Sequence, residues 1–175
     1  MDLDSSAAIG RKAASWNRPE ATWRRARDSS GLIDILLVED SPADAELARQ
    51  VLKEARVQSN LSVVRDGEAA MAFLHRRWPY ADSPRPDLIL LDLNLPRKDG
   101  REVLAELKHT DELRQIPVVV LSASPADEDV AGAYANHANA YIKKPVDLNE
   151  FVKCVRLVEA FWLGVACLPP SGGRA

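Results

Sequence analysis

The sequence lacks the features that would place a protein in a membrane, outside the cell or on nucleic acid. No run approaches the roughly 20 apolar residues that a membrane-spanning helix requires, and the N-terminus has no apolar segment typical of a secretory signal. The net charge of −3 at pH 7 gives no reason to expect nucleic-acid binding through bulk electrostatics. These absences predict a cytoplasmic protein with no membrane association.

Cysteine and histidine are also scarce, with two and three residues. Cys154 and Cys167 both fall in the apolar pattern of a final helix, which would hold them about 20 Å apart. A disulfide requires Cα atoms within about 7 Å, so we expect two reduced thiols. The histidines at 75, 109 and 137 lie in different helical patterns without metal-ligand spacing, and we expect surface or loop positions for them.

What the chain does contain, from Leu32 onward, is a regular alternation of short apolar runs and amphipathic segments. The runs are too short for helices and resemble buried parallel strands. Each is followed by helical spacing, and the last helix is predicted to run from near Asp147 to about Cys167. Five strands alternating with five helices predict a doubly wound α/β fold, in which a parallel sheet carries helices on both faces. The predicted strands are Ile33–Val38, Leu61–Val64, Leu88–Leu91, Val118–Leu121 and Ala140–Ile142.

This alternation also predicts the domain organisation. Residues 1–30 are rich in Ala, Ser and Arg without sustained periodicity, and we expect an N-terminal extension that is disordered or partly helical. Residues 31–168 hold all the predicted strands and the helices that alternate with them, and they are expected to form one domain. Residues 169–175 form a short tail rich in proline and glycine, so we expect no DNA-binding domain after the last helix.

Polar residues follow the predicted strands at the edge where a doubly wound sheet places its site. They are Glu39 and Asp40, Asp92, Ser122 and Lys144. Three neighbouring carboxylates would repel one another, and a bound divalent cation would offset that repulsion. A site with only oxygen ligands and few protein contacts suits Mg²⁺. A cation, a hydroxyl and an ammonium around one carboxylate suit phosphoryl transfer, with Asp92 as the nucleophile that forms an aspartyl phosphate.

Each of these residues also has a purely structural interpretation. An Asp after a strand is commonly a turn residue or a helix cap, and Glu39 and Asp40 could favour the next helix through its dipole. Ser122 could be a turn residue, and Lys144 a solvated cation. Residues suited to one chemistry at the ends of four strands are much less expected by chance than any one of them alone, and this pattern favours a functional site.

The segments that contain these residues resemble the receiver domain of two-component response regulators. The resemblance covers about residues 33–162 and implies a flavodoxin-like sheet with strand order 2-1-3-4-5. It implies a phospho-accepting switch that catalyses only its own phosphorylation and dephosphorylation, rather than an enzyme. The matching segments are ILLVEDSPAD (Ile35–Asp44), DLILLDLNLPRKDG (Asp87–Gly100), VVVLSAS (Val118–Ser124) and YIKKPVD (Tyr141–Asp147).

The resemblance assigns Asp92 as the phospho-acceptor. It also implies that Mg²⁺ is bound directly by Asp40, by Asp92 and by the backbone carbonyl of Asn94. Glu39 would bind the ion through a water molecule.

The remaining matches imply a phosphate partner and a switch. Lys144 corresponds to the lysine that pairs with the phosphate, and the Lys144–Pro145 bond to a peptide that is usually cis in the family. Ser122 corresponds to the hydroxyl that turns toward the phosphate, and Tyr141 to the aromatic side chain that rotates inward with it.

Three features resemble the response regulators paired with phytochrome-type histidine kinases. They are the phrase LPRKDGREVLAELK, the long Trp78–Pro86 loop with its three prolines, and the extended final helix. The partner implied is a sensor histidine kinase, with a phytochrome photoreceptor as the first candidate.

The final helix carries more apolar residues than one face against a sheet requires. Phe161 and Trp162 lie where this helix should overrun the sheet edge, and exposed aromatics are enriched in interface cores. We therefore expect a homodimer through the final helix, the fourth helix and the fifth strand. The alternative is that this end folds back and buries both rings within the monomer.

A phosphatase of the haloacid-dehalogenase class is an alternative with the same donors. Such enzymes require a second Asp two residues after the nucleophile as general acid. This chain has Asn94 there, which cannot transfer a proton in that role. Hydrolysis of p-nitrophenyl phosphate would separate the two functions.

Overall fold

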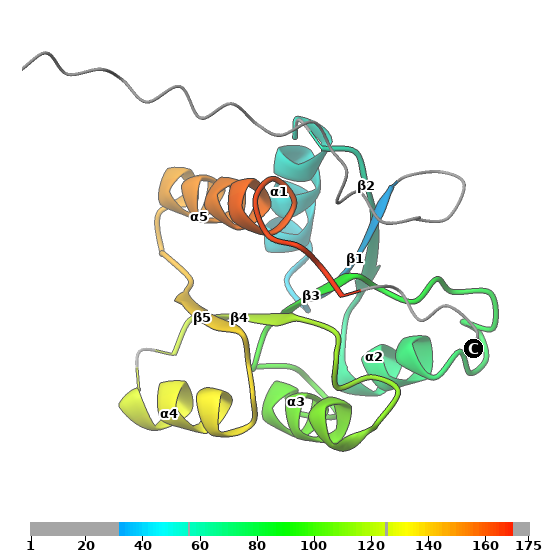
Figure 1. Ribbon diagram of the computed structural model, residues 1–175. Helices are drawn as coiled ribbons and strands as arrows, with labels where there is room; N and C mark the ends of the chain where they lie inside the picture. The colour runs from blue at the N-terminus through cyan, green and yellow to red at the C-terminus, as the bar shows by residue number, and fades with distance from the viewer. Residues whose placement is uncertain (1–31, 56, 125, 170–175) are drawn as a thin grey trace, which may run out of the picture.

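The computed structural model describes residues 32–55, 57–124 and 126–169, which contain one five-stranded parallel sheet (Figure 1). The strand order is β2-β1-β3-β4-β5, so the predicted α/β fold and its strand order are confirmed. The strands are β1 (Ile33–Val38), β2 (Ser59–Val64), β3 (Leu88–Leu91), β4 (Val118–Ser122) and β5 (Ala140–Lys143). The extension predicted over residues 1–30 lies outside the described residues, as does the predicted tail except for Pro169.

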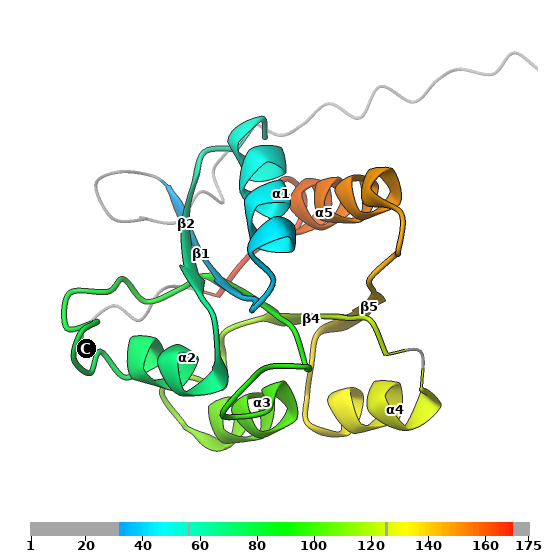
Figure 2. The ribbon, with the colours of Figure 1, turned by 180° about the vertical axis from the view of Figure 1, so that it is seen from behind.

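Helices cover both faces of the sheet, as Figures 1 and 2 show from opposite sides. One layer holds α1 and α5, and the other holds α2, α3 and α4. None of the helices in the described part of the chain is both long and apolar enough to span a bilayer. The helices are α1 (Pro42–Lys53), α2 (Gly67–Leu74), α3 (Gly100–His109), α4 (Asp127–Ala135) and α5 (Leu148–Trp162).

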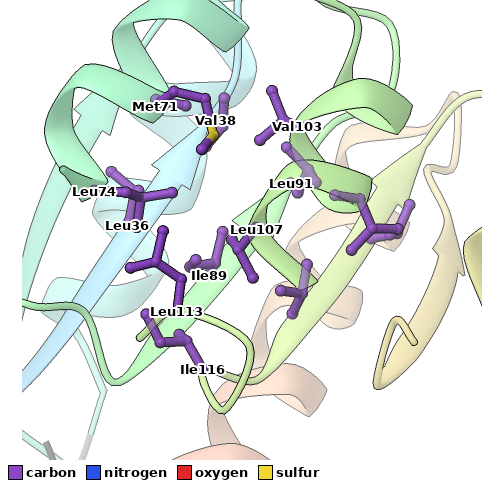
Figure 3. Close-up of a cluster of buried hydrophobic side chains, with 14 of the residues drawn as sticks. Leu36, Val38, Met71, Leu74, Ile89, Leu91, Val103, Leu107, Leu113 and Ile116 are labelled. Carbon is purple, nitrogen blue, oxygen red and sulfur yellow. The ribbon is translucent and has the colours of Figure 1, made fainter. Parts of the chain in front are cut away.

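Two apolar clusters, one on each face of the sheet, hold the layers together. Alternate residues of β1 and β3 pack against α2 and α3 (Figure 3), and the intervening residues pack against α1 and α5. Because both faces are covered, the central strands are continuous apolar runs, which is why their positions were predictable. The labelled residues of the first cluster include Leu36, Val38, Met71, Ile89, Leu91, Val103 and Leu107.

Side-chain oxygens begin four of the five helices in the described residues. Ser41 caps α1, with Pro42 as the first helical residue as predicted, and Asp66 caps α2. Asp99 caps α3, and Asp147 caps α5. Each cap accepts a bond from a backbone N–H that has no partner within the helix, which fixes where the helix starts.

The final helix is shorter than predicted. It ends at Trp162 rather than near Cys167, and the N–H of Ala166 donates to the carbonyl of Phe161 (2.7 Å) to close the last turn. Beyond this turn Leu168 packs against the apolar cluster beneath α1 and α5. Leu163 and Leu168 of the apolar pattern past the helix therefore pack against the core, whereas Val165 is exposed.

The two cysteines are free, as expected. Cys154 is half-buried within α5, whereas Cys167 is exposed beyond its end. The expectation that one straight helix separates them is therefore wrong.

The segment from Trp78 to Pro86 is a loop, as predicted, and connects α2 to β3. Its Trp78–Pro79 bond is the cis peptide among the described residues, and the expectation of a cis bond at Lys144–Pro145 is wrong. The two forms of an X–Pro bond differ by only about 0.5–1 kcal/mol, so a local sequence does not decide between them.

Candidate functional site

The register of the sheet brings the predicted residues to its carboxyl edge. Val38 of β1 lies opposite Leu91 of β3, and the N–H of Asp92 donates to the carbonyl of Val38 (3.0 Å). On the other side, the N–H of Lys144 donates to the carbonyl of Ser122 (2.8 Å). The residues that end or follow four of the strands therefore meet in one place, as the sequence predicted.

Three carboxylates form the centre of this site. Carboxylate oxygens of Glu39, Asp40 and Asp92 lie within 4.8 Å of one another. Glu39 and Asp92 are buried, whereas Asp40 is exposed. The pKa of Glu39 is raised overall, because the effect of burial exceeds the lowering effect of its hydrogen bond with Lys144. A hard divalent cation fits a group of carboxylate oxygens with one open side, and it would offset the repulsion among them.

Lys144 supplies the positive charge of the site. Its Nζ lies 2.6 Å from Oδ2 of Asp92, and it also pairs with Glu39. Burial alone would lower the pKa of Lys144, but hydrogen bonds to Asp92 and Glu39 outweigh it and raise the pKa. The ammonium is therefore held charged, in direct contact with the carboxylate predicted to accept the phosphoryl group.

Asp44 is a further neighbour of this lysine that the sequence analysis did not identify. It lies in the first turn of α1, and its Oδ2 is 3.4 Å from the Nζ of Lys144. The only sequence signal was its place in the ILLVEDSPAD segment, because an Asp in a first helical turn is ordinarily explained by the helix dipole.

The predicted switch residues meet at Ser124, to which the sequence analysis gave no role in the switch. Ser122 is fully buried, and its hydroxyl accepts a bond from the N–H of Ser124 (3.2 Å). Tyr141 is half-buried, and its hydroxyl donates to the carbonyl of Ser124 (2.9 Å). The loop between β4 and α4 thus connects the two side chains.

The loop after β3 folds tightly behind Asp92. The N–H of Gly100 donates to the carbonyl of Leu93 (2.8 Å), and a Cβ on Gly100 would lie 2.1 Å from the backbone oxygen of Asp92. No side chain fits at that distance from backbone. The N–H of Asn94 donates to Oδ1 of Asp92 (2.9 Å), so this loop also orients the carboxylate.

Replacement of Gly100 by Ala is expected to destabilise the protein by about 2 kcal/mol or more, because the loop must move away from Asp92. Gly132 is a matched control, since a Cβ there meets nothing within 4 Å. Gly132→Ala is expected to stabilise the protein by up to about 1 kcal/mol through helix propensity. Urea unfolding of the two variants measures both effects, and equal stabilities would contradict the tight approach at Gly100.

Comparison with known proteins places this site in a family. The model of the family described as the response regulator receiver domain matches residues 35–156, which contain every predicted site residue. The response regulator Rcp1 of Synechocystis sp. is 53% identical over 137 residues, which make up 78% of this chain and 93% of Rcp1. The match to this relative therefore spans nearly its whole length.

Two solved structures have the same fold. The crystal structure of the Mn²⁺-bound form of Rcp1 gives a TM-score of 0.77 at 52% identity, covering 78% of this chain and 99% of that chain. The crystal structure of the phosphorylated cyanobacterial phytochrome response regulator RcpA gives a TM-score of 0.77 at 48% identity, and the match covers 79% of this chain and 99% of that chain.

Proposed function

The chain belongs to the family of response regulator receiver domains, and on this premise we propose that Asp92 accepts a phosphoryl group from a sensor histidine kinase. The observation that carries the proposal is the contact between Lys144 and Asp92, within a group of three carboxylates at the carboxyl edge of the sheet. Phosphotransfer from a purified phytochrome-type kinase, followed by location of the phosphoryl group on the chain, tests it.

The proposed chemistry requires a nucleophile, an oriented donor and charge stabilisation. A carboxylate oxygen of Asp92 attacks the phosphorus of the phosphohistidine, the P–N bond breaks, and its electron pair goes to the imidazole nitrogen. Lys144 contacts Oδ2 of Asp92, so its ammonium would lie beside the transferred phosphoryl group and stabilise the negative charge on the phosphoryl oxygens. The N–H of Asn94 holds the second carboxylate oxygen in place.

We propose Mg²⁺ as the divalent cation, bound by Asp40, Asp92 and the backbone carbonyl of Asn94. It would neutralise charge on the transferred group. The N–H of Ser41 donates to one oxygen of Glu39 (3.1 Å) and Lys144 pairs with the other, which favours an indirect role for Glu39 through water. The Mn²⁺-bound form of Rcp1 supports a divalent ion in such a site.

Asp40→Asn is expected to weaken Mg²⁺ binding by at least tenfold, because it replaces a charged direct ligand. Glu39→Gln is expected to weaken it less, since Glu39 is proposed to bind the ion only through water. Isothermal titration calorimetry with Mg²⁺ measures both constants, with Asp82→Asn as an exposed control. Equal effects at positions 39 and 40 would contradict the proposed division between direct and water-mediated binding.

Phosphorylation is proposed to act on a switch formed by Ser122 and Tyr141. The Ser122 hydroxyl would turn toward the phosphoryl group, and Tyr141 would rotate inward. The bonds from both residues to Ser124 support this coupling, because the loop between β4 and α4 must move with Ser122.

We further propose a homodimer through α5, β5 and α4. Leu157, Phe161 and Val165 are exposed at intervals of four residues along α5 and its last turn, which makes an apolar stripe. The expectation of exposed aromatics holds for Phe161, which is 54% exposed. It is wrong for Trp162, which is half-buried against the cluster beneath α1 and α5 because the chain turns back there.

Light scattering at micromolar concentration is expected to give the mass of a dimer for the wild type and of a monomer for Leu157→Ser/Phe161→Ser. Loss of two apolar anchors at the centre of an interface commonly costs several kcal/mol. Trp78→Ser is the matched control, because Trp78 is 89% exposed on the loop after α2. A wild-type monomer across that range, or dissociation by the control alone, would contradict this interface.

The relatives support a phytochrome-type histidine kinase as the partner, since RcpA is a cyanobacterial phytochrome response regulator. A cytoplasmic location is proposed accordingly. We assign residues 31–168 to the receiver domain and residues 1–30 to an extension, because the described strands and helices fall between residues 33 and 162. The receiver family consists of signalling switches, and we propose that this chain catalyses only its own phosphorylation and dephosphorylation.

A further inference from the structure

Helix α4 is held in place by few contacts of its own. Ala133 is its one buried residue, whereas each of the other described helices buries at least three. Its N-cap is Ala126, which makes no side-chain hydrogen bond, although the other four helices have Ser or Asp at this position. A helix with neither an apolar face nor a cap is the element most easily displaced.

A cavity of about 70 Å³ lies between α4 and α3. Leu93, Leu104 and Ala133 give it an apolar lining, and Gly132 presents no side chain to fill it. The other lining residues are polar: Arg101, Glu128, Asp129 and Asn136. Few apolar side chains therefore lie between the two helices.

Arg101 spans this gap with polar contacts. Its Nε and Nη2 donate to Oδ1 of Asp129 on α4 (2.9 and 2.6 Å), and its Nη1 donates to Oδ2 of Asp99 (3.0 Å). Asp99 is the N-cap of α3. One guanidinium thus ties the first turn of α4 to the first turn of α3, and we call Arg101 and Asp129 the α4 latch.

The latch continues to the switch residues through Ser124. The N–H of Asp129 donates to the carbonyl of Ala126 (3.0 Å), and the N–H of Ala126 donates to the hydroxyl oxygen of Ser124 (3.3 Å). The N–H of Ser124 donates to the hydroxyl of Ser122, and its carbonyl accepts from Tyr141. The first turn of α4, which Arg101 holds through Asp129, is therefore bonded to the residue at which the two switch side chains meet.

From these contacts we infer that Arg101 is a positioning residue for the switch. Through Asp129 it holds α4 and Ser124 in the arrangement in which the Ser122 hydroxyl is engaged by Ser124. Movement of Ser122 toward a phosphoryl group on Asp92 then requires the α4 latch to loosen, so the latch sets how readily the switch changes state. This inference rests on the proposed roles of Asp92, Ser122 and Tyr141.

The size of the expected effect follows from the exposure of the pair. The side chain of Arg101 is 43% exposed and that of Asp129 18% exposed, so solvent screens their interaction. Partly exposed ion pairs of this kind shift an equilibrium by about two- to fivefold. Such a shift is measurable at α4 because this helix buries only Ala133 and is otherwise held by the bond from the N–H of Tyr141 to the hydroxyl of Tyr134 (3.3 Å).

The test compares Arg101→Gln and Asp129→Asn with Arg114→Gln, which removes the exposed Arg114–Asp111 pair at a distance from the switch. The rate of Asp92 phosphorylation by acetyl phosphate with Mg²⁺ is expected to rise about two- to fivefold in both latch variants and to stay unchanged in the control. Amide NMR signals of Ser124 and Tyr141 in the unphosphorylated latch variants are expected to move toward their phosphorylated positions, which a merely structural role would not cause.

The charge-swapped double variant Arg101→Asp/Asp129→Arg is expected to restore a rate nearer the wild type than either single variant does. Wild-type rates and unshifted signals in folded Arg101→Gln and Asp129→Asn would overturn the inference, as would slower phosphorylation. Failure of the wild type itself to take up phosphate on Asp92 would instead overturn the proposed function.

Discussion

Replacement of Asp92 by Asn is expected to abolish phosphorylation of the chain. Asn has the same size, and its side-chain oxygen can still accept the bond from the N–H of Asn94. An amide is not a nucleophile toward phosphorus, so the acceptor is lost while the fold is retained. We expect incorporation of phosphate from a histidine kinase or acetyl phosphate, followed by intact-protein mass spectrometry, to fall to background.

Two controls separate loss of the nucleophile from loss of structure. Asp82→Asn removes an exposed carboxylate from the loop after α2 and is expected to leave phosphorylation unchanged. The thermal midpoint of Asp92→Asn is expected to equal or exceed that of the wild type, because one of several neighbouring charges is removed. Phosphate uptake by folded Asp92→Asn at a rate near the wild type would contradict the proposed acceptor.

Lys144→Met is expected to give the largest loss of stability. The variant leaves the buried carboxylates of Glu39 and Asp92 without their cation, and loss of one partner from a buried ion pair costs about 3–5 kcal/mol. Urea unfolding at pH 7 without Mg²⁺ measures the loss. Lys153→Met, which breaks an exposed pair with Glu150, is the matched control and is expected to change stability by less than about 0.5 kcal/mol.

The loss at Lys144 is expected to depend on pH in a defined direction. Burial already raises the pKa of Glu39, and removal of Lys144 takes away the hydrogen bond that lowers it. When the pKa of a carboxyl group is higher in the folded than in the unfolded state, the group costs no stability at a pH below its unfolded-state pKa. Stability is lost as the pH rises through the folded-state pKa, because the carboxyl group must then be charged in the folded protein. The deficit of Lys144→Met is therefore expected to shrink as pH falls toward the ordinary range of Glu.

Mg²⁺ is expected to restore part of the stability of Lys144→Met, because a bound cation replaces the missing positive charge. The expected rescue is larger for this variant than for the wild type, in which the ammonium already offsets the carboxylates. A deficit that neither shrinks at lower pH nor responds to Mg²⁺ would show that Lys144 acts through packing alone.

The sequence by itself determined the fold and the edge of the sheet at which the candidate site residues meet. Buried parallel strands must be short apolar runs, and helices on both faces require the alternation that was read from the chain. The polar residues after these runs, such as Asp92 and Lys144, had to meet because parallel strands share one carboxyl edge. The Ser41–Pro42 helix start was equally predictable, because a cap depends on neighbouring residues alone.

Tertiary structure alone decided the contacts between residues distant in the chain. No local pattern indicates that Asp44 lies beside Lys144, or that Arg101 reaches Asp129 across a cavity. The end of α5 also depended on packing. The apolar spacing there fits both a longer helix and a turn that returns the chain to the core. In the structure the helix ends at Trp162, and Leu168 is half-buried against the cluster beneath α1 and α5. Local spacing specifies which face a side chain occupies, whereas the packed neighbours decide what it touches.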